Sequence, residues 1–151
     1  MVSIRKSNKP NISQVSVLVV DDHGPFRELI CSILGKRAEL KIIGEASDGL
    51  EAVFKSEKLQ PDLIILDIGL PSLNGIEAAR RIVKLAPKSK IVFLSQESSP
   101  DIVRSALSLG AMGYVAKSKT SCDLLSAVEA VVQGKQFLSA RLADQVHIDP
   151  K

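Results

Sequence analysis

The sequence predicts an α/β protein built on one parallel sheet, and three observations support this fold class. Short apolar runs alternate five times with longer segments in which apolar residues recur every three or four positions. Two of the runs, Val15–Val20 and Asp62–Leu66, are apolar at almost every position, which is typical of central strands that helices cover on both faces. The 151 residues, 45% of them apolar, suffice for one hydrophobic core but not for two. We therefore expect a three-layer α/β/α sandwich.

Five strands are expected in a single parallel sheet. Right-handed crossover connections leave few topologies, and the flavodoxin-like strand order 2-1-3-4-5 is the one we expect. This order places the carboxyl ends of the first and third strands next to each other. In chain order, the predicted strands are Val15–Val20, Leu40–Glu45, Asp62–Leu66, Lys90–Leu94 and Gly113–Val115.

Five helices are expected to follow these strands. Pro25 stands at the first helical position, which favours proline, and Gly35 and Gly110 stand where the periodic pattern ends. Pro61 prevents the second helix from running into the next strand. The predicted helices are residues 25–34, 49–59, 75–86, 100–109 and 121–133.

One folded domain is expected over residues 15–134. Residues 1–14 show neither period and are predicted to be a flexible leader, and residues 135–151 are predicted to be a linker or C-terminal tail. The net charge of +3 is that of an ordinary solvated surface, so nucleic-acid binding by this chain alone has weak support. Neither a membrane-spanning stretch nor a signal peptide is found, so we expect no membrane contact and a cytoplasmic location.

Charged residues stand where three of the predicted strands end. Asp21 and Asp22 follow the first strand, Asp67 follows the third, and Lys117 comes shortly after the fifth. Because the carboxyl ends of parallel strands form one edge, these side chains are expected to converge. Three carboxylates about 5 Å apart repel by roughly 3 kcal/mol per pair at an effective dielectric constant near 20. A divalent cation such as Mg²⁺ would relieve this repulsion, with the Gly69 backbone carbonyl as a further ligand.

The same residues suit phosphoryl transfer. Asp67 is best placed to attack phosphorus, and Lys117 and the hydroxyl of Ser95 would contact the phosphoryl oxygens. Each residue also has a plainer interpretation: Asp21 or Asp22 as a helix cap, Lys117 as a surface lysine, and Ser95 as a turn residue. Five further residues are given only structural places: Tyr114 in the core, His23 and His147 on the surface, and Cys31 and Cys122 as free thiols.

Five segments of the chain resemble the receiver domain of two-component response regulators. They are residues 17–23, 61–71, 74–75, 91–95 and 110–117. The acid pair, the phosphoacceptor, the hydroxyl and the lysine occur in the family's order, and the resemblance extends from Val15 to about Val132. It implies that Asp67 accepts phosphate from a histidine kinase or phosphotransfer protein. It further implies that Asp22 binds Mg²⁺ directly and Asp21 largely through water.

The resemblance also implies a switch rather than an ordinary enzyme. Ser95 and Tyr114 would respond to phosphorylation, and the chain would catalyse only its own phosphorylation and dephosphorylation. Residues 127–139 resemble the end of receivers attached to LuxR-type helix-turn-helix domains. A homodimer formed through the fourth helix, fifth strand and fifth helix is expected, and DNA would be bound only through an output domain absent from this chain.

Three other classes were compared with this interpretation. A haloacid dehalogenase-type phosphatase needs a second Asp two residues after its nucleophile, but position 23 is His. A flavodoxin-type flavin carrier needs a phosphate loop, and Asp21 and Asp22 would repel that phosphate. A receiver used only for docking has no need of the complete set of acids and lysine. Two departures from the family pattern, Ser118 in place of a common proline and the small Gly69, leave the chemistry intact.

Overall fold

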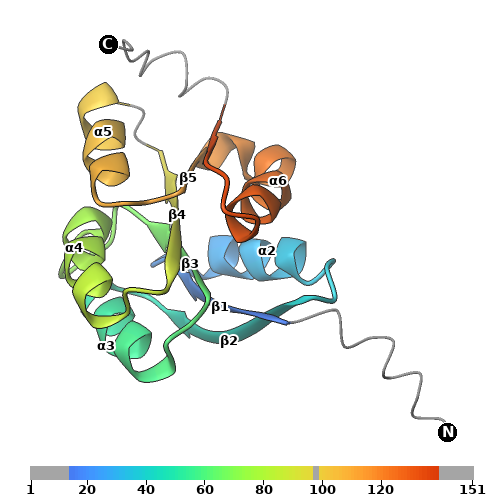
Figure 1. The fold of residues 1–151 in the computed structure, drawn as a ribbon, viewed down its shortest axis with the longest axis horizontal. Helices are drawn as coiled ribbons and strands as arrows, with labels where there is room; N and C mark the ends of the chain where they lie inside the picture. Colours follow the sequence, from blue (N-terminus) through green and yellow to red (C-terminus); the bar gives the residue numbers. More distant parts are fainter. Residues whose placement is uncertain (1–13, 97–98, 140–151) are drawn as a thin grey trace, which may run out of the picture.

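The computed structural model describes residues 14–96 and 99–139, which form an α/β domain (Figure 1). Each predicted strand and helix is present, with its ends displaced by at most one residue. In chain order the elements are β1 (Val15–Val20), α2 (Gly24–Leu34), β2 (Leu40–Ala46), α3 (Gly49–Leu59), β3 (Leu63–Asp67), α4 (Gly75–Leu85), β4 (Lys90–Ser95), α5 (Pro100–Ser108), β5 (Gly113–Ala116), the 3₁₀ turn η1 (Lys117–Lys119), α6 (Thr120–Val132) and β6 (Phe137–Leu138).

All strands of the sheet run parallel, in the order β2-β1-β3-β4-β5-β6. The predicted order of the first five strands is therefore confirmed. The predicted number is wrong by one, because β6 adds a sixth strand at the edge of β5. A strand of two residues is too short to show an alternating pattern, so it could not be predicted from the sequence.

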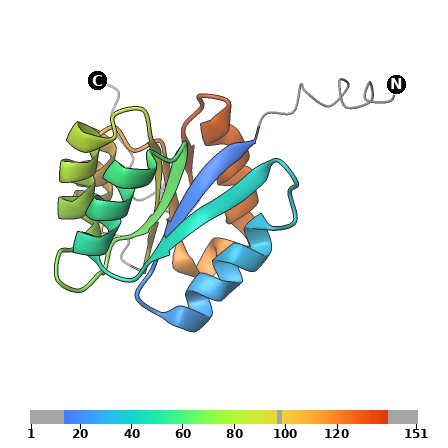
Figure 2. The same cartoon turned by 90° about the horizontal axis from the view of Figure 1, so that it is seen from below.

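Helices cover both faces of the sheet, which confirms the three-layer arrangement (Figures 1 and 2). Alternate residues of β1 point to opposite faces: Val17 and Val19 pack with α2 and α6, while Leu18 and Val20 pack with α3 and α4. Every residue of β3 is buried, as expected for a central strand between two helical layers. Among the helices of the described residues, none combines the length and the apolar character needed to span a membrane.

The short strand β6 is held in place by a buried serine. Ser139, fully buried, donates its backbone N–H to the Tyr114 carbonyl at 3.1 Å. Its hydroxyl oxygen accepts from the Ala116 N–H at 3.1 Å and donates to the Asp123 carboxylate at 2.9 Å. One side chain thus ties the segment after α6 to both β5 and α6.

Ser139→Ala should lower the free energy of unfolding by about 1–3 kcal/mol, because it leaves the Ala116 N–H and the Asp123 carboxylate without this buried partner. Urea unfolding would measure the change. Ser108→Ala is the matched control, since its exposed hydroxyl bonds only to the Ser105 carbonyl. Equal stability losses in the two variants would contradict a special role for Ser139.

Candidate functional site

Three carboxylates meet at the carboxyl edge of the sheet. Asp21 follows β1 and is fully buried, Asp22 is exposed, and Asp67 is the buried last residue of β3. One oxygen atom from each side chain lies within 4.8 Å of the others. The crossover topology brings these residues together, since β1 and β3 are hydrogen-bonded neighbours although 44 residues lie between Asp22 and Asp67 in the printed sequence.

The loop after β1 fixes the acid pair and starts α2. The Asp21 carboxylate accepts the His23 N–H at 2.8 Å, and His23 Nδ1 accepts the Phe26 N–H at 3.3 Å. His23, not Asp21 or Asp22, is therefore the N-cap of α2, and its side chain is exposed as expected. Arg27 adds a second restraint, because its Nη1 donates to the Asp21 carbonyl at 2.7 Å and its Nε to the Glu45 carboxylate at 2.8 Å.

Asp67 is held from the side of α4. The Gly69 N–H donates to the Asp67 carboxylate at 3.1 Å, and the Gly75 N–H donates to the Ile68 carbonyl at 2.7 Å. A side chain at Gly75 would collide with the Asp67 carbonyl oxygen, so only glycine lets α4 begin this close to the strand end. By contrast, a side chain at Gly69 would meet nothing within 4 Å, so the space beside Asp67 is open.

Lys117 supplies the positive charge of the site. It begins η1 directly after β5, and its Nζ lies 2.9 Å from Asp21 Oδ2 and 3.4 Å from Asp67 Oδ2. The contact with buried Asp21 Oδ2 is short but poorly directed, so we treat it as an ion pair rather than a hydrogen bond. Only 15% of the Lys117 side chain is exposed, and its Nζ also lies 4.7 Å from the centre of the Phe26 ring.

The charges of Asp67 and Lys117 influence each other's ionisation. Burial raises the pKa of Asp67, and the Asp21 charge adds to this, while Lys117 and the Gly69 N–H oppose it. Burial lowers the pKa of Lys117, but its contacts with Asp21 and Asp67 outweigh that effect, so the pKa is raised overall. Three carboxylates and one ammonium leave the cluster with a formal charge of −2. This charge and the all-oxygen donor set fit one hard divalent cation such as Mg²⁺.

The strands that follow β3 in the sheet, β4 and β5, carry Ser95 and Tyr114. Ser95, the buried last residue of β4, is paired in register with Ala116, the residue before Lys117. Tyr114 is fully buried in β5, and its ring centre lies 6.1 Å from that of Phe93. His147, which the sequence predicts to be a surface residue, lies outside the described residues, and so does Glu97, two residues after Ser95 in the sequence.

The sequence did not identify Phe26 and Arg27 as residues of the site. Phe26 belongs to the apolar stripe of α2, and this pattern predicts only that its ring packs inward. Arg27 is an ordinary charged residue on a helix. No spacing rule brings Phe26 to a lysine at position 117, because that contact depends on the strand order.

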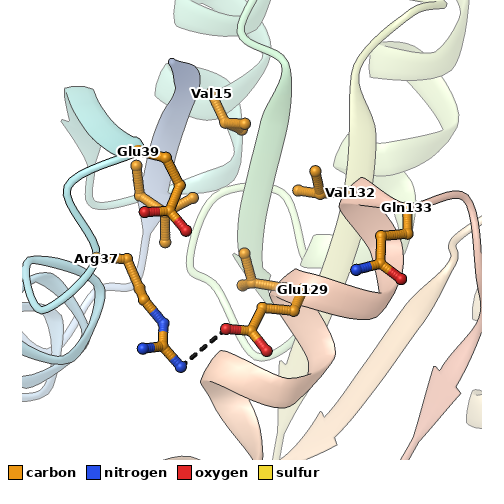
Figure 3. A pocket seen from close by; sticks show the side chains of 8 residues that line it. Val15, Arg37, Glu39, Glu129, Val132 and Gln133 are labelled. Atoms are coloured by element: carbon orange, nitrogen blue, oxygen red, sulfur yellow. Dashed lines mark ion pairs between the residues drawn. The ribbon is translucent and has the colours of Figure 1, made fainter. Parts of the chain in front are cut away.

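A shallow pocket lies at the opposite edge of the sheet (Figure 3). Val15 and Leu40, the first residues of β1 and β2, line it together with Val132, the last residue of α6. Arg37 Nη2 and Glu129 Oε2, also in its lining, form an ion pair at 2.8 Å. Its volume of about 130 Å³ is below the roughly 300 Å³ of the smallest ordinary ligand sites, and it is separate from the acidic cluster.

The fold is a doubly wound α/β domain, and the site joins three carboxylates and one lysine at the carboxyl edge of its sheet. The family model described as response regulator receiver domain matches residues 17–129. The chain therefore belongs to the response regulator receiver domain family of two-component systems.

Individual relatives agree with this family. The chain is 33% identical over 132 residues to the transcriptional regulatory protein DegU of Brevibacillus brevis, covering 87% of this chain and 56% of DegU. A LuxR-family two-component response regulator from Aurantimonas sp. SI85-9A1 has a TM-score of 0.85 at 30% identity, covering 89% of this chain and 96% of that one. The isolated receiver of RcsB from Salmonella enterica serovar Typhimurium, solved with the phosphomimetic BeF₃⁻, has a TM-score of 0.83 at 25% identity and covers 89% and 99%. The chain spans little more than half the length of DegU.

Asp67→Asn should stabilise the metal-free protein at neutral pH. The pKa of Asp67 is raised by folding, so its ionisation opposes folding. That cost is absent below the ordinary Asp pKa of about 3.9, grows as the pH rises through the raised folded pKa, and is constant above it. Thermal unfolding with a chelator should give a melting temperature a few degrees above that of the parent at pH 7, with a smaller difference near pH 4.

Asp101→Asn provides the control for this measurement. Its side chain is 93% exposed and its Arg104 partner lies 3.7 Å away, so its charge is screened by water and the melting temperature should not change. A lower melting temperature of Asp67→Asn at pH 7 would contradict the electrostatic argument.

Proposed function

We propose that this domain accepts a phosphoryl group on Asp67 from a histidine kinase or phosphotransfer protein, in the cytoplasm, and passes the signal on through a changed protein interface. The supporting observation is the convergence of three carboxylates and Lys117 at one edge of the sheet, with Asp67 at the end of a fully buried strand.

In the proposed reaction, an Asp67 carboxylate oxygen forms a bond to phosphorus while the bond from phosphorus to the donor's histidine nitrogen breaks. The donor imidazole leaves and takes up a proton from water. Lys117, already 3.4 Å from Asp67, would contact the phosphoryl oxygens from one side and Ser95 from another. The open space at Gly69 leaves a route for the donor and, later, for the water that hydrolyses the acyl phosphate.

Mg²⁺ would be held by Asp21, Asp22, Asp67 and the Gly69 carbonyl, and when bound it neutralises charge on the phosphoryl oxygens. Asp22 is the exposed member of the cluster and would bind the metal directly, while Asp21, buried and paired with Lys117, would act largely through water. Loss of Asp22 should therefore cost more metal affinity than loss of a water-mediated ligand.

Phosphorylation adds roughly −1.5 to −2 charges beside Lys117 and Ser95. We infer that Ser95 and Tyr114 respond as the switch and change the contacts made by α5, β5 and α6, where a homodimer would form. In the structure β6 covers the edge of β5, so a partner on this side meets β6 as well as the helices.

Binding to DNA, and with it control of transcription, would come only through an output domain outside this chain.

The test is phosphorylation by a small donor. Incubation with acetyl phosphate and Mg²⁺ should add one phosphoryl group, seen by intact-mass spectrometry, and Asp67→Asn should add none. Asp22→Asn should label more than tenfold more slowly at low Mg²⁺, because a direct metal ligand is lost. Arg80→Gln, a change on the exposed side of α4, should label like the parent. Labelling of Asp67→Asn at the parent's rate would show that the assignment is wrong.

Gly69→Arg should lengthen the lifetime of the phosphoryl group several-fold. A Cβ at this position would meet no neighbour within 4 Å, so we expect an arginine to be tolerated and to fill the approach to Asp67 that water would use. Dephosphorylation rates after removal of the donor would measure the effect. Glu97→Ala is the comparison. From its place two residues after Ser95 in the sequence we expect the Glu97 carboxylate at the mouth of the pocket. A charge exposed there would contribute only about 0–1 kcal/mol, so the effect of Glu97→Ala should be smaller. A larger effect of Glu97→Ala would reverse this ranking, which stays a prediction from the sequence.

A further inference from the structure

The Phe26 ring covers the ammonium group of Lys117 at the proposed phosphorylation site. The distance from Lys117 Nζ to the ring centre is 4.7 Å, which is within the range of a cation–π interaction. The same Nζ contacts Asp21 and Asp67. An ammonium group has three N–H donors, so it can contact both carboxylates while one side of it faces the ring.

The ring is held by the loop that carries the acid pair. Phe26 lies in the first turn of α2, its N–H is capped by His23, and Pro25 precedes it. The next residue, Arg27, donates to the Asp21 carbonyl. Phe26 and Asp21 therefore approach Lys117 as parts of one braced unit, and the ring does not depend on a flexible segment for its position.

The ring differs from the carboxylates in one chemical respect. Asp21 and Asp67 belong to the oxygen cluster that suits a divalent cation, so a metal and Lys117 compete for them. An aromatic face has no affinity of this kind for Mg²⁺, whose ligands are oxygens. The contact with Phe26 is thus the one of the three that metal binding leaves intact.

We propose that Phe26 is a positioning residue, which keeps the Lys117 ammonium at the pocket when the carboxylates turn to the metal and so presents it to the phosphoryl oxygens. This inference rests on the proposed function of Asp67. It concerns the chain's own contact between Phe26 and Lys117, which exists without a metal.

A second aromatic–lysine contact in the chain provides a matched control. Lys58 Nζ lies 5.6 Å from the centre of the Phe54 ring on α3. Phe54 is 59% exposed, so water screens this pair, whereas Lys117 is only 15% exposed. Phe54→Leu therefore makes the same chemical change at a surface position with no role in the site.

The experiment measures the affinity for beryllofluoride, a phosphoryl mimic, by calorimetry in saturating Mg²⁺. Phe26→Leu keeps the apolar bulk but removes the ring, and it should weaken binding about five- to tenfold. Phe26→Tyr restores a ring and should bind within about twofold of the parent. Phe54→Leu should bind like the parent. Phe26→Met replaces Phe26→Leu if the latter does not fold.

A double-mutant cycle separates positioning from a general packing role. If Phe26 acts through Lys117, then Phe26→Leu should have no further effect on beryllofluoride affinity in a Lys117→Gln background. The same cycle on thermal unfolding without metal should show coupling between the two positions, which tests the contact independently of phosphoryl binding.

The outcomes distinguish the inference from the function on which it rests. A parent protein that binds no beryllofluoride would overturn the proposed function and the inference with it. A parent that binds, together with a Phe26→Leu variant of equal affinity, would overturn the inference alone. An equal loss from Phe26→Leu in the parent and Lys117→Gln backgrounds would do the same, because the ring would then act through packing and not through the lysine.

Discussion

Repulsion among the carboxylates of Asp21, Asp22 and Asp67 is the constraint on which the rest of the structure depends. Nothing in the chemistry of the three side chains draws them together, and burial makes the charge on Asp67 still more costly. They remain together because β1 and β3 pair as neighbours inside a core in which the strand residues from Val17 to Val20 and from Leu63 to Leu66 are buried. Packing free energy along two strands thus maintains a charge arrangement that favours cation binding at their ends.

Lys117 balances part of this charge, and its own position is set by several elements. It follows β5 directly, its stem ends between Asp21 and Asp67, and the ring of Phe26 lies against the ammonium. The remaining formal charge of the cluster is −2, which a divalent cation would neutralise. In the proposed function, a covalent phosphoryl group on Asp67 would change this balance again and would act on the groups next to it.

Most of the fold could be predicted from the sequence because long apolar runs and proline or glycine stops mark the elements strongly. The convergence of Asp21, Asp67 and Lys117 also followed, since parallel strands with right-handed crossovers allow few arrangements. Strand β6 could not be predicted, because Phe137 and Leu138 are too few to show a period. The cap on α2 was also missed: histidine is an uncommon cap, and the preceding acids are better caps by residue type. The contact of Phe26 with Lys117 exists only in three dimensions.

The position of β6 links the charged edge to the end of the described chain. On one side β5 pairs with β4, whose last residue is Ser95, and on the other it pairs with β6. Ser139 bonds to Tyr114 and Ala116, so it contacts the backbone of the strand that ends at Lys117. In the proposed switch, a displacement of Lys117 toward a phosphoryl group would act on a strand that is bonded directly to Ser139. This adjacency gives the proposed switch a short physical route from Asp67 to the end of the described chain, through β5 and one buried serine.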